Sequence, residues 1–79
     1  MQPFIAVDIE TANRRDGGSI CQISIVKYDG QEIKTEFSSL VNPLVEFDPF
    51  CVNIHGITEE DVKDAPSFSQ IEETIRPLL

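Results

Sequence analysis

Two acidic residues near the N-terminus have the spacing of a metal-binding pair. Asp8 and Glu10 end a run whose residues 4–7 are all apolar. Such a run predicts a β-strand over residues 3–11 that is buried on both faces. Because side chains alternate along a strand, both carboxylates are expected on one face. At roughly 6 Å and an effective dielectric of about 20, they would repel each other by about 3 kcal/mol. A hard divalent cation with oxygen ligands is the usual means of offsetting that repulsion, so the pair predicts a metal site.

The residues that follow predict the framework that positions this pair. The polar residues 13–19 have the composition of a loop. A strand is expected over residues 20–28, followed by Asp29-Gly30, which is typical of a two-residue hairpin turn with positive φ at both positions. Alternating polarity predicts a further strand over residues 33–41, paired antiparallel with the one before it.

The second half of the chain carries the signals of short helices. Pro49 predicts little regular structure before Val52. Residues 58–61 and 67–70 have the form of capping boxes, so a helix is expected to begin at each. Pro77 should end the second of them, because it lacks the backbone donor that a helix interior needs.

Composition narrows the classes of protein to consider. The chain has 6 basic and 14 acidic residues and a net charge of −8, the opposite sign from an electrostatic nucleic-acid binder. A nucleic-acid partner would therefore require metal ions at the site or a basic surface supplied elsewhere. No apolar run is long enough to span a membrane and no basic segment precedes one, so a cytoplasmic location without a membrane partner is expected. Cys21 and Cys51 have no nearby Cys or His partner and are expected to be buried free thiols.

The order of motifs resembles the first part of a DnaQ-like exonuclease domain of the DEDD superfamily of 3′–5′ exonucleases. Residues 7–11, Val-Asp-Ile-Glu-Thr, resemble the first exonuclease motif of that group. Residues 54–58, Ile-His-Gly-Ile-Thr, resemble a later segment, and the match continues through Phe68. Among the members of the superfamily, the pattern is most similar to the epsilon-subunit type of bacterial DNA polymerase III.

This resemblance implies a fold, a reaction and site residues. The fold is α/β, a ribonuclease-H-like mixed sheet, of which residues 1–79 would form the N-terminal portion: three strands with a β-hairpin, then helices. The reaction is metal-dependent removal of nucleotides from a 3′ end, with four carboxylates holding two divalent metals, Mg²⁺ or Mn²⁺. Asp8 and Glu10 match the first two of those catalytic, metal-binding acids. The residues that match the nucleotide-binding part are Ile9 (through its backbone), Thr11 and His55.

The sequence departs from the family pattern at two places. Many relatives continue the first motif with Thr-Gly, where this chain has Ala12-Asn13; Asn13 tolerates the left-handed conformation that glycine would supply. The motifs with the remaining carboxylates and the general-base histidine do not occur within the 79 residues. The isolated chain is therefore expected to bind at most one metal ion weakly, to be inactive, and to form dimers through an uncovered strand edge.

Several alternatives remain open on the sequence alone. The expected substrate is the 3′ end of single-stranded DNA, with a DNA polymerase subunit as a partner in proofreading. An exoribonuclease of the same superfamily and a non-catalytic nucleic-acid-binding or interaction module are the alternatives; the retained Asp8 and Glu10 argue against the latter. A phosphatase with a strand-end aspartate nucleophile ranks lower, because it expects a different motif. Arg14 and Arg15 are either solvated loop residues or phosphate contacts.

Overall fold

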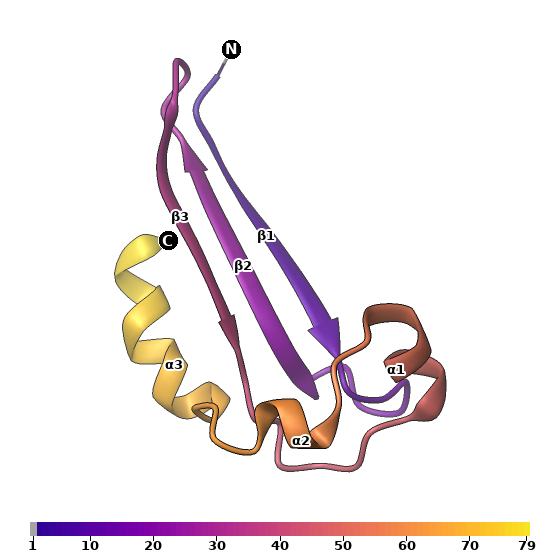
Figure 1. Ribbon diagram of the computed structural model, residues 1–79. Coiled ribbons are helices and arrows are strands. Elements are labelled where there is room, and N and C mark those ends of the chain that lie inside the picture. The colour runs from indigo at the N-terminus through magenta and orange to yellow at the C-terminus, as the bar shows by residue number, and fades with distance from the viewer. Residues whose placement is uncertain (1) are drawn as a thin grey trace.

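The computed structural model describes residues 2–79, which form an antiparallel sheet followed by short helices (Figure 1). The strands, in the order β1-β2-β3, are β1 (Phe4–Thr11), β2 (Ile20–Tyr28) and β3 (Ile33–Leu40). The helical segments are α1 (Pro49–His55), α2 (Glu59–Val62), α3 (Phe68–Ile75) and the 3₁₀ turn η1 (Arg76–Leu78). No helix within residues 2–79 is long and apolar enough to cross a membrane. The predicted fold class is confirmed: an α/β fragment with three strands, a β-hairpin and C-terminal helices.

The pairing of the strands gives the sheet two chemically different faces. Ile9 lies opposite Ile23, and the rows on that side are mostly apolar. Asp8 lies opposite Ser24, which in turn lies opposite Ser38, with the two hydroxyl oxygens 3.1 Å apart. Residues directly opposite each other in an antiparallel sheet share a face. The sheet therefore has one mostly apolar face and a second face, the polar face, on which Asp8, Ser24 and Ser38 form a polar row beside the apolar pair of Ala6 and Val26.

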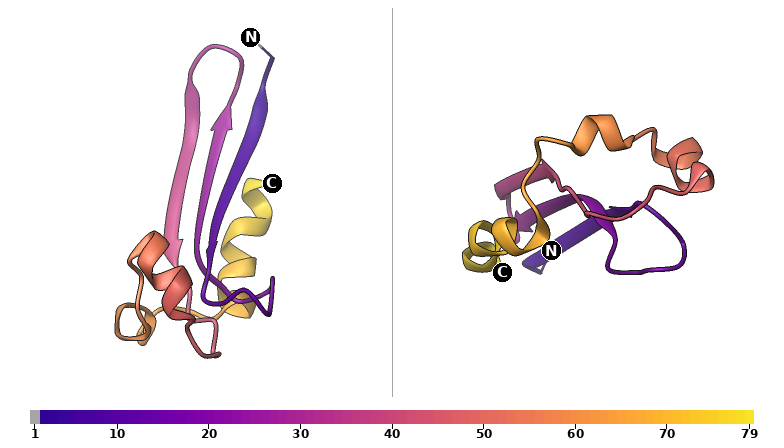
Figure 2. Two further views of the ribbon diagram at one scale, coloured as in Figure 1. Left: turned by 90° about the vertical axis from the view of Figure 1, so that its right-hand side faces the viewer. Right: turned by 90° about the horizontal axis from the view of Figure 1, so that it is seen from below.

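Helix α3 lies along the apolar face and forms the main core (Figure 2). Its buried Ile71 and Ile75 pack against Ile23, Ile25 and Val41. Burial of such side chains is worth about 1.5–3 kcal/mol each. The packing of α3 on β2 and β3 thus supplies much of the stability of this chain.

The two predicted capping boxes are present and define where α2 and α3 begin. At α3, the Ser67 hydroxyl accepts from the Gln70 backbone N–H, and Gln70 Oε1 accepts from the Ser67 backbone N–H at 2.9 Å. Thr58 and Asp61 make the same reciprocal pair at α2. Helix α3 gives way to the 3₁₀ turn that contains Pro77, as predicted.

The prediction of little regular structure before Val52 is wrong. Helix α1 begins at Pro49, where a proline costs no hydrogen bond because the first N–H groups of a helix have no partner within it. Asp48 caps this end by accepting a hydrogen bond from the Phe50 backbone N–H at 2.9 Å. Gly56 ends the helix in the left-handed conformation, with φ of 74°. Proline is disfavoured in the interior of a helix but is tolerated in its first turn.

The connection between β2 and β3 is longer than the predicted two-residue turn. It spans residues 29–32, and within it only Gly30 has a positive φ, 102°. Asp29 Oδ1 accepts hydrogen bonds from the backbone N–H groups of Gln31 and Glu32 at 2.8 and 2.9 Å. These bonds shape the loop in the manner of an Asx turn. The two-residue turn is therefore wrong, whereas the antiparallel pairing of the flanking strands is confirmed.

The prediction that β1 is buried on both faces is also wrong. The apolar side chains of β1 keep 42–52% of their surface accessible; they are Phe4, Ile5, Val7 and Ile9. Within residues 2–79, β1 has a neighbouring strand on one side only, and the core cluster under α3 draws its strand residues from β2 and β3. An apolar run indicates a strand suited to burial, but which element covers it is decided by other parts of the molecule.

We expect Ile25→Ala to lower the free energy of unfolding by about 2–5 kcal/mol, because Ile25 is fully buried beneath α3. The matched control is Ile33→Ala, since Ile33 is 53% exposed and should change stability by about 1 kcal/mol or less. Urea unfolding followed by circular dichroism measures both changes. Equal losses for the two variants would contradict this assignment of the core.

Candidate functional site

Asp8 and Glu10 lie on the polar face of the sheet, toward the end of β1. They are paired with Ser24 and Gln22, which share that face of β2. Both carboxylates therefore occupy one face, as strand alternation predicted. The main core cluster under α3 lies on the opposite face, whereas Leu40, which is paired with Gln22, packs against a second cluster that contains Cys21.

The surroundings of the two carboxylates leave them available to a cation. Asp8 is exposed and Glu10 is half-buried, and within residues 2–79 no salt bridge joins either of them to a basic side chain. Two charges roughly 6 Å apart repel by about 0.7 kcal/mol in bulk water and by about 3 kcal/mol at the effective dielectric of a protein surface. The pair is accessible and unpaired, but burial does not force it to bind a metal.

Within residues 2–79, Asp8 and Glu10 are the two carboxylates that this site offers to a metal ion. In the part of the chain that the structure describes, no group of three or more His, Cys, Asp or Glu side chains could hold a metal ion. Mg²⁺ commonly binds through one or two carboxylates and retains several waters. Asp8 and Glu10 therefore fit one such ion whose other ligands are waters or groups from outside these residues.

Asn13 organises the loop that follows β1. Its side chain is buried; Oδ1 accepts from the backbone N–H groups of Arg15 and Asp16 at 3.0 and 2.9 Å, and Nδ2 donates to the Glu46 carbonyl at 3.0 Å. Among residues 2–79, Leu44 is the one non-glycine residue with positive φ. Asn13 therefore does not use the left-handed conformation that it tolerates. Asn13 suits this position because its side-chain amide can both accept and donate the hydrogen bonds that shape the loop.

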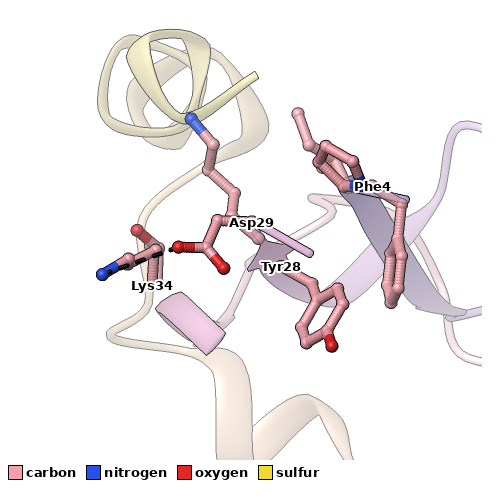
Figure 3. A pocket seen from close by; sticks show the side chains of 8 residues that line it. Phe4, Tyr28, Asp29 and Lys34 are labelled. Carbon is pink, nitrogen blue, oxygen red and sulfur yellow. Dashed lines mark ion pairs between the residues drawn. The ribbon is translucent and has the colours of Figure 1, made fainter. Parts of the chain in front are cut away.

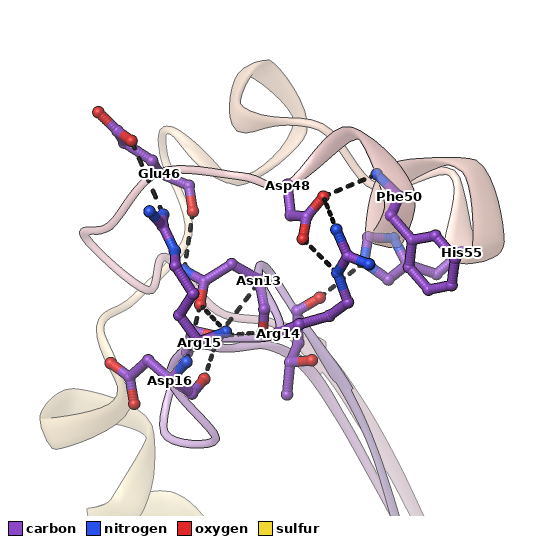
Figure 4. A network of polar contacts seen from close by, with 10 residues as sticks. Asn13, Arg14, Arg15, Asp16, Glu46, Asp48, Phe50 and His55 are labelled. Atoms are coloured by element: carbon purple, nitrogen blue, oxygen red, sulfur yellow. Dashed lines mark hydrogen bonds and ion pairs between the residues drawn. The ribbon is translucent and has the colours of Figure 1, made fainter.

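Arg14 is held in place by two neighbours on and beside α1 (Figure 4). Its Nε donates to Asp48 Oδ2 at 2.6 Å, its Nη2 donates to Oδ1 at 3.3 Å, and its guanidinium carbon lies 4.3 Å from the centre of the Phe50 ring. The hydrogen bond from Arg14 is the main cause that lowers the pKa of Asp48. Arg15 makes a longer contact, 3.8 Å to Glu46, between two exposed side chains. Arg14 is thus an exposed loop residue that also forms an ion pair within the fold.

A hydrogen bond from the His55 side chain joins the C-terminal end of α1 to the C-terminal end of β1. Its Nε2 lies 2.9 Å from the Thr11 carbonyl oxygen, and its Nδ1 accepts a hydrogen bond from the Ile57 backbone N–H at 2.9 Å. His55 and Thr11 are 44 residues apart, and the structure places these two predicted nucleotide-binding residues in contact. No pattern in the sequence signals this hydrogen bond.

Cys21 lies beside the contact between His55 and Thr11, and its thiol is buried and protonated at neutral pH. Its sulfur is 3.8 Å from His55 Nε2, and its side chain is fully buried. Burial raises the pKa of the Cys21 thiol to about 11, and the nearby Glu10 carboxylate adds to the shift. Cys51 is also buried, and both thiols are free, as predicted.

A shallow hollow of about 650 Å³ lies at the other end of the sheet (Figure 3). Phe4 and Tyr28 contribute rings whose centres are 5.2 Å apart, and Lys34 contacts Asp29 at 3.6 Å. The hollow contains none of the predicted site residues. It therefore does not extend the candidate site around Asp8 and Glu10.

We expect Asn13→Gly to lower the free energy of unfolding by about 1–3 kcal/mol, because three hydrogen bonds of the buried amide are lost. If Asn13 merely stood in for glycine, this substitution would be neutral or stabilising. Asn13→Asp keeps the two bonds accepted by Oδ1 but places a buried carboxylate oxygen against the Glu46 carbonyl oxygen, so it should also be destabilising. Thermal unfolding of the three proteins measures both losses.

Comparisons with known proteins place the chain among nucleases. A family model described as an exonuclease, RNase T, matches residues 5–79. The chain is 35% identical over 75 residues to a Mycobacterium tuberculosis protein whose name describes a bifunctional exonuclease/endonuclease, covering 86% of this chain and 12% of that protein. It is 29% identical over 80 residues to the 3′-5′ exonuclease DinG of Bacillus subtilis, covering 99% and 9%. It is 30% identical over 79 residues to RNA exonuclease 4 of Mycosarcoma maydis, covering 96% and 20%.

The chain spans a fifth or less of the length of these relatives, since the matched shares of them are 12%, 9% and 20%. The family match, by contrast, covers nearly all of this chain and includes Asp8, Glu10 and His55. The resemblance inferred from the motifs is thereby confirmed at the level of the family. The chain belongs to the RNase T family of exonucleases.

Proposed function

We propose that these residues form the N-terminal portion of a domain that removes nucleotides from the 3′ end of single-stranded DNA in a metal-dependent reaction. The observation that supports this proposal most directly is the pair of unpaired carboxylates, Asp8 and Glu10, on one face of β1. The family match and the relatives named as exonucleases support the reaction class.

In this proposal each predicted site residue has a distinct task. Asp8 and Glu10 hold Mg²⁺ or Mn²⁺, which when bound stabilises charge on the phosphodiester and provides a nucleophilic hydroxide. Thr11 and the backbone of Ile9 contact the terminal nucleotide, beside His55. The complete domain holds two ions, and the two carboxylates of this chain hold at most one of them weakly.

The charge of the chain makes a cation important for substrate binding as well as for chemistry. The net charge of −8 repels a polyanion, and Arg14 is already engaged by Asp48. A divalent ion between Asp8 and Glu10 reverses the local sign where the phosphate must approach. In the proofreading form of the proposal, a DNA polymerase subunit would add the basic surface that this chain lacks.

RNA is the second candidate substrate, because one of the relatives is named RNA exonuclease 4. The two substrates differ by the 2′-hydroxyl, which a protein distinguishes through contacts at the sugar. Matched DNA and RNA oligonucleotides therefore separate the two candidates.

We expect the full-length protein, supplied with Mn²⁺, to shorten a 5′-labelled single-stranded oligonucleotide from its 3′ end. Asp8→Asn should reduce the rate by about 100-fold or more, because it removes one of the two carboxylate ligands of the metal ion. The control is Glu36→Gln, which neutralises an exposed acid of β3 on the polar face and should leave the rate unchanged. The isolated 79 residues should not cut, since two carboxylates do not hold two ions. The proposal fails if Asp8→Asn is as active as Glu36→Gln, or if the wild type shortens neither DNA nor RNA.

We further propose that the 79-residue chain self-associates through β1. Its outer edge carries unpaired backbone groups, and Ile5, Val7 and Ile9 are 42–52% exposed. Pairing with β1 of a second copy would satisfy these backbone groups and partly cover the apolar side chains through cross-strand contacts.

Light scattering at increasing protein concentration should show a dimer that is favoured by salt, because screening weakens the repulsion between two chains of charge −8. Val7→Lys should give a monomer. Leu44→Lys, which makes the same change of charge at a residue that is 75% exposed and outside the sheet, should not. A wild-type monomer at high concentration and high salt would refute the proposed association.

A further inference from the structure

The two hydrogen bonds of the His55 ring determine which nitrogen carries its proton. The Ile57 backbone N–H can only donate, so Nδ1 accepts that bond and is unprotonated. The neutral ring then carries its proton on Nε2, which points to the Thr11 carbonyl oxygen at 2.9 Å and donates to it. Both ring nitrogens are thus committed to backbone partners.

The Thr11 carbonyl lies at an irregular point of the sheet. Glu10 pairs with Gln22, but Thr11 pairs with Ile20, so β2 carries an extra residue between these two pairs. Such a bulge redirects the strand and the side chains beside it. The donor on His55 therefore holds the backbone immediately after Glu10, where ladder pairing alone is interrupted.

The other end of α1 holds the next carbonyl of the same strand end. The Asp48 backbone N–H donates to the Ala12 carbonyl at 2.7 Å, and Asp48 is the N-cap of α1. The consecutive carbonyls of Thr11 and Ala12 are therefore fixed by the two ends of one helix. His55 supplies the contact that is nearer to the acidic pair.

We infer that His55 is a positioning residue whose Nε2–H fixes the backbone at Glu10–Thr11 and thereby directs the Glu10 carboxylate and the Thr11 side chain. The effect of this role on metal binding rests on the proposed function, whereas the hydrogen bonds of His55 do not depend on it. It requires no transfer of a proton by His55. It leaves only the faces and carbon edges of the ring for contact with a nucleotide.

Two substitutions separate the two hydrogen bonds of the ring. In His55→Gln the terminal amide nitrogen takes the place of Nε2, so the donor to Thr11 is kept and the acceptor for Ile57 is lost. In His55→Asn the amide oxygen takes the place of Nδ1, so the acceptor is kept and the donor to Thr11 is lost. Both variants remove one bond and both should unfold at a lower temperature than the wild type.

The test uses the full-length protein and three measurements. Imidazole ¹⁵N NMR of the metal-free wild type should show the proton on Nε2; a proton on Nδ1 overturns the inference without any variant. Backbone amide shifts of Glu10 and Thr11 should move in His55→Asn and stay near wild type in His55→Gln. Mn²⁺ affinity, from the electron paramagnetic resonance signal of free Mn²⁺, should fall about 10-fold in His55→Asn and change little in His55→Gln.

The outcomes distinguish this inference from the proposed function. If the wild type binds Mn²⁺ and the two variants lose affinity equally or not at all, the positioning role is wrong and the metal site stands. If the wild type binds no Mn²⁺, the proposed function fails, and the amide shifts alone decide whether His55 fixes the strand end. A variant that does not fold leaves the ¹⁵N measurement to decide.

Discussion

The candidate site depends on the attachment of helix α1 to the end of β1. Thr11 and Ala12 present consecutive carbonyls, and these accept hydrogen bonds from His55 at one end of the helix and from the Asp48 backbone at the other. Arg14 reinforces the second contact by pairing with Asp48 through both carboxylate oxygens. A strand end held at two successive residues has little freedom to rotate, so the acids that precede it keep a defined direction. The bulge beside Cys21 would otherwise be a point of flexibility.

Local signals in the sequence predicted the elements whose structure is determined locally. The strand predicted over residues 20–28 is β2, and the pairs Thr58–Asp61 and Ser67–Gln70 correctly indicate the starts of α2 and α3. In each case the residues that decide the structure are within a few positions of one another. The acidic pair was found in the same way, because two residues on one strand share a face irrespective of what packs around them.

The remaining features depend on contacts between distant segments. The burial of β1 is set by what covers it, and its own apolar composition carries no information about that. Asn13 donates from its amide to the carbonyl of Glu46, 33 residues away, which no local pattern shows. The hydrogen bond between His55 and Thr11 was missed for the same reason. Helix α1 is a different case, because Pro49 disfavours a helix interior but, directly after the N-cap Asp48, it is the first residue of the helix.

The separation of the two faces of the sheet has a consequence for how such a chain can diverge. Isoleucines on one side pack under α3, while Asp8, Ser24 and Ser38 on the other side carry little of that packing. Substitutions of the exposed polar residues on that side are therefore expected to cost little folding stability. Homologues can acquire new substrate preferences there by gradual drift, without first needing compensating changes beneath the helix.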